Sequence, residues 1–96
     1  MAKKFIVKQR FRNRAQNVFS FLLKEWDSKV AEDFLSILQS RMEAVVENPL
    51  LGSPTESYRN LRSFSVTPPN RLFYRIEKEI VVFIMLQDTR KRRYRR

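Results

Sequence analysis

The chain of 96 residues contains no cysteine and no histidine. Without cysteine it can form neither a disulfide nor a thiolate metal site, and without histidine it lacks the commonest general base at neutral pH. We therefore expect no metal and no cofactor. The longest apolar run, Ile80–Leu86, has seven residues, whereas a membrane helix needs roughly 20. Basic residues also interrupt the N-terminal stretch, so we expect a cytoplasmic protein with no membrane contact.

Acidic residues are missing from both ends of the chain. Residues 1–14 and residues 90–96 each carry six basic side chains and no acid, while the segment between them is close to neutral and the formal net charge is +10. Clustered cations attract polyanions and gain entropy when counterions are released. Nucleic acid is the first candidate partner on charge, and an acidic protein segment is the second. The remaining alternative is a solubilising surface with a basic tail.

The first half of the sequence predicts a strand and two helices. Residues 4–11 alternate loosely, which indicates a short strand. From Asn13 to Trp26 apolar residues recur every three or four positions, the stripe of an amphipathic helix. Asp27 and Ser28 can cap a second helix, whose apolar positions continue to the Asn48–Pro49 pair. Two helices with a short connection predict an antiparallel hairpin.

The second half predicts strands. A loop containing Gly52, the one glycine of the chain, precedes strands at Leu61–Val66, Arg71–Ile76 and Ile80–Leu86. The order β-α-α-β-β-β predicts an α+β fold, in which the helical hairpin covers one face of a three-stranded antiparallel sheet. We expect one domain over residues 1–96 with a basic tail at 90–96. If the apolar side of the middle strand faces the helices, Arg71 and Arg75 lie on the open face.

Several segments together resemble a known family, the RelE/ParE superfamily of bacterial type II toxin–antitoxin toxins, which includes plasmid stabilisation proteins. The most specific of them is the block Arg71–Ile76, followed by an apolar strand and by Asp88-Thr89-Arg90. The others match in the same order along nearly the whole chain: Glu25-Trp26-Asp27-Ser28-Lys29, Glu47-Asn48-Pro49 with Gly52, and Leu61-Arg62.

The resemblance implies a small cationic toxin that a cognate antitoxin holds inactive. Toxins similar to RelE enter the ribosome and cut mRNA, whereas toxins similar to ParE inhibit DNA gyrase and have no known hydrolytic chemistry. Both branches share the fold, so the fold cannot choose between them. The antitoxin is expected to be an acidic segment with apolar anchors, lying over the helices or the open sheet face.

Candidate site residues follow from the ribonuclease branch. Cleavage through the 2′-hydroxyl needs cations for the phosphate and groups that move protons. By resemblance, Arg62, Arg71, Arg90 and Tyr94 are the candidate catalytic residues. The candidate nucleic-acid-binding residues are Arg75, Lys91, Arg92, Arg93, Arg95 and Arg96. Arginine stabilises charge well but transfers protons poorly at neutral pH, so the missing histidine weakens this assignment.

Three functions follow. The first, which we expect because the strand arginines suit RNA phosphates, is inhibition of translation by ribosome-dependent mRNA cleavage, with RNA binding at the arginines; the other two are alternatives. The second is ParE-like inhibition of DNA gyrase without catalysis, which the absence of a convincing proton-transfer group favours. The third is a detoxified relative that only binds its antitoxin.

Overall fold

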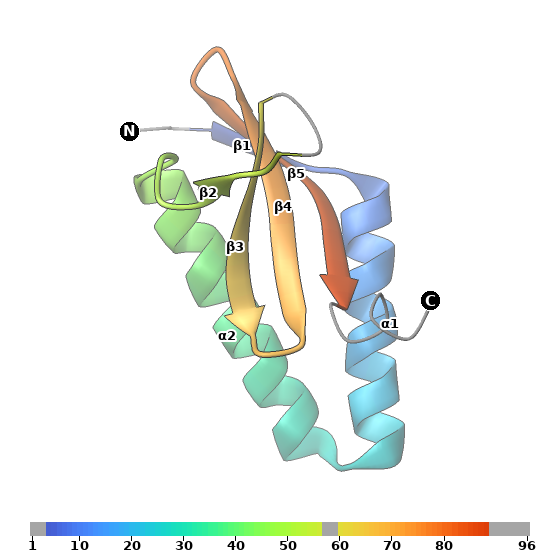
Figure 1. The fold of residues 1–96 in the computed structure, drawn as a ribbon. Coiled ribbons are helices and arrows are strands. Elements are labelled where there is room, and N and C mark those ends of the chain that lie inside the picture. The colour runs from blue at the N-terminus through green and yellow to red at the C-terminus, as the bar shows by residue number, and fades with distance from the viewer. Residues whose placement is uncertain (1–3, 57–59, 89–96) are drawn as a thin grey trace.

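The computed structural model describes residues 4–56 and 60–88. The elements in chain order are β1 Lys4–Val7, α1 Gln9–Glu25, α2 Ser28–Glu47, β2 Ser53–Pro54, β3 Leu61–Thr67, β4 Asn70–Glu77 and β5 Ile80–Asp88. The predicted α+β class is confirmed, with an N-terminal strand, a helical hairpin and three successive antiparallel strands. Both helices lie on the same face of the sheet, and the end of the hairpin projects beyond the β3–β4 turn (Figure 1).

The sheet has five strands in the order β1-β5-β4-β3-β2, two more than the predicted antiparallel core of three. The additional strands lie at the two edges. β1 pairs with β5 in parallel, and β2 pairs with β3 through two residues. A two-residue strand is too short to produce an alternating pattern, and a parallel pair between the two ends of the chain leaves no local signal.

The first strand ends earlier than predicted. It stops at Val7, and α1 begins at Gln9 rather than at Asn13. Lys8 occupies the N-cap position without a side-chain hydrogen bond, so the usual sequence mark of a helix start is missing. The earlier start places Phe11 on the buried stripe, where its ring lies 5.6 Å from that of Phe83 and only 1% of the residue is exposed.

The helical hairpin has the predicted connection. The Asp27 carboxylate accepts a hydrogen bond from the backbone N–H of Val30 at 3.0 Å and so caps α2. α2 ends at Glu47, directly before the Asn48–Pro49 pair. Neither helix is long and apolar enough to cross a membrane in the part of the chain that the structure describes.

The core lies between the hairpin and the sheet. Leu72 and Tyr74 of β4 are fully buried on the side of the helices, together with Phe83 of β5. Arg71 and Arg75 occupy the alternate positions of β4 and are half-buried. Side chains of a strand alternate between the two faces, so both arginines lie on the open face, as the sequence predicts.

Candidate functional site

The open face of the sheet carries two arginines with different surroundings. An Arg71 guanidinium nitrogen (Nη2) donates to the Ser63 hydroxyl at 3.0 Å. Arg75 forms an ion pair with Glu77, and their side chains are 39% and 51% exposed. Arg75 therefore has its charge partly compensated, whereas Arg71 has a neutral partner and keeps its full charge for a ligand.

Apolar side chains share this face with the arginines. Phe73 lies between them on β4 and is paired with Met85 of β5, and both side chains are half-buried. Directly paired residues of neighbouring strands project to the same side. The open face is thus a mixed surface of apolar and cationic groups, of the kind that protein interfaces use.

Arg62 lies on the opposite face from Arg71. It is paired with Tyr74, whose side chain is buried toward the helices, whereas Arg71 is paired with Ser65. The Arg62 Nε donates to the Gly52 carbonyl at 3.0 Å, and its Nη2 donates to the Leu50 carbonyl at 3.3 Å. The structure therefore does not bring the Arg62 and Arg71 guanidinium groups together, and it directs Arg62 toward backbone acceptors.

Tyr74 also fixes the loop of residues 49–52, to which Arg62 donates. Its hydroxyl donates to the Pro49 carbonyl at 2.7 Å and accepts from the Gly52 N–H at 2.9 Å. A Cβ atom at position 52 would lie 2.7 Å from both the Ser63 carbonyl and the Tyr74 hydroxyl, so only glycine fits without a shift. This loop clamp, formed by Arg62 and Tyr74 on residues 49–52, is absent from the sequence prediction. The lone glycine after a helix end was the signal that could have found it.

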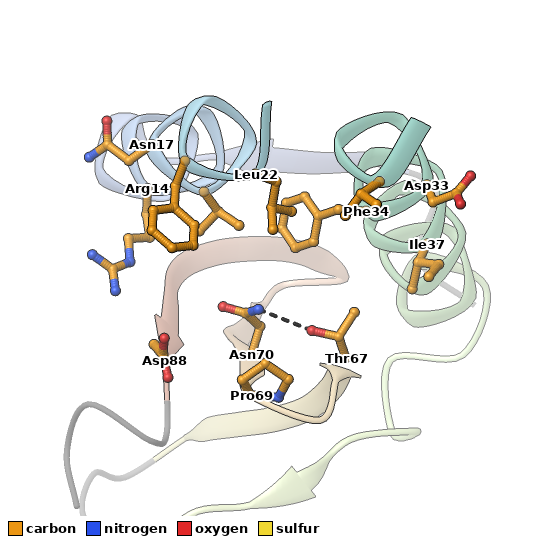
Figure 2. Close-up of a pocket in the computed structure, with 13 residues that line it drawn as sticks. Arg14, Asn17, Leu22, Asp33, Phe34, Ile37, Thr67, Pro69, Asn70 and Asp88 are labelled. Carbon is orange, nitrogen blue, oxygen red and sulfur yellow. Dashed lines mark hydrogen bonds between the residues drawn. The ribbon is translucent and has the colours of Figure 1, made fainter. Parts of the chain in front are cut away.

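A groove of about 620 Å³ opens where the hairpin projects past the sheet. Figure 2 shows Leu22 of α1 and Phe34 of α2 reaching into it from above, and Pro69 and Asn70 facing them from the β3–β4 turn. Its apolar walls are formed by Val18, Phe21, Leu22, Val30, Phe34, Ile37 and Pro69, and its polar residues are Arg14, Asn17, Asp33, Thr67, Asn70 and Asp88.

Apolar side chains of both helices lie exposed along the hairpin end of the groove. Phe21 and Val30, on facing helices, are 56% and 36% exposed although they line it, and Trp26 at the hairpin connection is 69% exposed. Asn70 is buried, but its amide donates to the Thr67 hydroxyl at 3.0 Å. An apolar groove with a polar rim suits an apolar helix face better than a small polar substrate.

The remaining predicted site residues lie outside the described part of the chain. They are Arg90, Lys91, Arg92, Arg93, Tyr94, Arg95 and Arg96. Over residues 4–56 and 60–88, no group of three or more histidine, cysteine, aspartate or glutamate side chains is placed to hold a metal ion.

Comparison with known proteins gives the family. The model of the family described as "ParE toxin of type II toxin-antitoxin system, parDE" matches residues 5–94. The chain belongs to the ParE toxin family. It is therefore a toxin of a type II toxin–antitoxin module, within the RelE/ParE superfamily that the sequence resembles. No curated protein matches it.

Two solved structures share the fold of this ParE-family chain. One is described as the "Chromosomal ParDE TA system from P. aeruginosa", with a TM-score of 0.77 and 10% identity over 88% of this chain and 94% of that chain. The other is a copper-bound mutant toxin from Helicobacter pylori, with a TM-score of 0.63 and 15% identity over 95% of this chain and 98% of that chain. At these identities the likeness concerns the fold alone.

Proposed function

We propose that this ParE-family toxin inhibits DNA gyrase by binding it, without cleaving RNA. The observation that carries the proposal is the separation of Arg62 from Arg71. Two of the candidate catalytic arginines lie on opposite faces of the sheet, and Arg62 donates to the carbonyls of Leu50 and Gly52. For Arg62 and Arg71 to bind the same phosphate, Arg62 would first have to give up its hydrogen bonds to the loop of residues 49–52.

The neighbours of Arg71 support the same conclusion. On its face lie Ser63, Ser65, Phe73 and Gln87, according to the strand pairing. None of these side chains exchanges a proton readily at neutral pH, whereas general acid–base cleavage needs two groups that do. A surface that combines a cation with apolar side chains is sufficient for an inhibitor that acts by binding.

Cleavage of mRNA on the ribosome, which the strand arginines favour from the sequence, is the second candidate. Arg71 and Arg75 both lie on the open face, four residues apart on β4 with Phe73 between them, and two cations along one strand suit a phosphate backbone. Arg90 and Tyr94 would have to supply the remaining chemistry.

Purified full-length toxin distinguishes the two candidates. It is titrated into a supercoiling reaction of purified gyrase, and separately into translating ribosomes whose mRNA is mapped by primer extension. The proposal predicts loss of supercoiling and intact mRNA. Cut mRNA with unimpaired supercoiling would reverse the assignment, and an effect on neither would favour the detoxified relative.

The family description further implies a cognate antitoxin, and we propose that a helix of it binds in the groove between α1 and α2. The groove is apolar, open at its hairpin end, and extended by exposed apolar side chains of both helices. Amphipathic helices bind such grooves through residues spaced three and four apart. The toxin's charge of +10 favours an acidic partner segment around that helix.

A further inference from the structure

The solvent-facing surface of the first half of α1 carries cations and amides and no acid. The first acidic residue of the chain is Glu25. We call this the cationic α1 surface. Its exposed members are Lys8, Gln9, Arg10, Arg12, Asn13, Gln16 and Asn17, and Arg14 is half-buried at the groove rim.

The cations flank the amides on the helix. Residues four apart lie on the same side, so Lys8 and Arg12 form one flank, and Arg10 and Arg14 form the other. Between the flanks, the Gln9 amide donates to Asn13 at 2.8 Å. Phe11 points in the opposite direction, into the core. The surface is therefore a strip of amides with cations along both sides.

This arrangement opposes helix stability. The N-terminal end of a helix carries a partial positive charge, which favours acids and disfavours cations, and the first turn of α1 has no acid. The ion pairs that occur among residues 4–56 and 60–88, Lys29–Asp33 and Arg75–Glu77, include none of the four cations. Neither the helix dipole nor either of these ion pairs stabilises the four cations, so they are available to an external anion.

We propose that the cationic α1 surface binds duplex DNA. Arginine and lysine neutralise phosphates, and arginine, asparagine and glutamine are also the side chains that hydrogen-bond base edges in the major groove. That groove, about 12 Å wide in B-form DNA, admits an α-helix, whereas the narrow major groove of duplex RNA does not. The carboxylates of an acidic protein would only accept from the amides, whereas base edges offer both donors and acceptors, which match the NH2 and carbonyl groups of Asn and Gln.

The position of α1 permits this contact. The helix forms one side of the molecule, with its N-terminal half next to β5, and no other helix or strand of residues 4–56 and 60–88 lies over its outer surface (Figure 1). The inference goes beyond gyrase inhibition, because it assigns a nucleic-acid contact to the toxin itself. It is tested in the absence of gyrase, so its failure and that of the proposed function are distinguishable.

The test compares two full-length variants with the same change of net charge. In the first, the four cations of the surface are replaced (K8Q/R10Q/R12Q/R14Q). In the control, four exposed cations elsewhere are replaced (K24Q/K29Q/R41Q/K78Q). Binding to a short DNA duplex is measured by fluorescence anisotropy over a salt series, with a duplex RNA and polyglutamate as parallel probes.

The α1 variant is expected to lose at least about tenfold in affinity for DNA, and its salt slope is expected to fall by about 3 to 4, since each phosphate contact contributes about 0.9. The control variant should keep the wild-type slope. Because cations at the start of a helix oppose its dipole, the α1 variant should fold at least as stably as the wild type; the pairs K8Q/R12Q and R10Q/R14Q repeat the test with half the change.

Three results would overturn the proposal. An equal loss of DNA affinity in both variants would show that the binding depends on net charge and not on the position of the cations. Wild-type DNA binding by the α1 variant would assign the contact to another surface. The toxin could also bind duplex RNA or polyglutamate more tightly than DNA. If the α1 variant lost that binding, the surface would be assigned to that other polyanion.

Discussion

At the scale of single residues, two of the three strand arginines of this toxin, Arg62 and Arg71, have different roles. Arg62 and Tyr74 together make four hydrogen bonds to residues 49–52, so they fix the loop that follows α2. Within the described residues, Arg71 makes one side-chain hydrogen bond, to the Ser63 hydroxyl. The sequence presents both as basic strand positions, and only the pairing register separates their faces, since a shift of one residue moves a side chain to the other side.

Replacement of each arginine by methionine tests this difference. Methionine keeps much of the aliphatic stem and removes the donors. We expect R62M to lower the free energy of unfolding by about 1–3 kcal/mol, because two backbone carbonyls lose a charged donor. R71M should lower it by less than about 1 kcal/mol, since its single partner is a serine hydroxyl that accepts water instead.

Urea denaturation followed by circular dichroism measures both values. Because R62M and R71M make the same substitution, R71M is the control for the general effect of removing an arginine from a strand. Equal stability of R62M and the wild type would contradict a clamping role for Arg62 and would return it to the candidate catalytic residues.

At the scale of elements, the sequence predicts the helices and strands that have a periodic apolar pattern, and it misses features that lack one. The long stripes of α1 and α2 and the three C-terminal strands are correct in type and order. The N-terminal strand is also correct in type, but its end and its pairing with β5 are not predicted, and neither are the uncapped helix start after Lys8 and the short edge strand β2. Each of these is set by tertiary packing: Phe11 against Phe83, and short pairings between distant segments.

The groove between the helices is also a feature of elements, because residues of both helices and of the β3–β4 turn form it. We expect F21D/V30D to weaken binding of the cognate antitoxin by at least about tenfold, since burial of one large apolar side chain contributes about 1.5–3 kcal/mol. Both positions are exposed in the free toxin, so the fold should be retained. Isothermal titration calorimetry measures the affinity.

L35D is the control for this prediction. Leu35 lies on α2, is 40% exposed and is not part of the groove. Antitoxin affinity that falls equally in L35D and in F21D/V30D would argue against the groove as the binding site.

At the scale of the whole molecule, the described part of the toxin presents the groove at the hairpin end, the cationic α1 surface, which adjoins the groove at Arg14 and Asn17, and the open sheet face with Arg71 and Arg75. Composition alone favours a polyanion or an acidic partner over a surface that serves only solubility. Composition does not show which surface binds which partner, because this depends on which faces of the sheet the helices cover. The family is recognisable from short motifs, whereas the target is not, since both branches of the superfamily use one fold.

The most direct test of gyrase inhibition is the order of events in bacteria after induction of the toxin. Plasmid supercoiling, read on chloroquine gels, and incorporation of labelled amino acids are followed in the same culture from the first minutes. Our account predicts that plasmids relax while protein synthesis continues, and that co-expression of the antitoxin prevents the relaxation. Arrest of protein synthesis while plasmids remain fully supercoiled would contradict it.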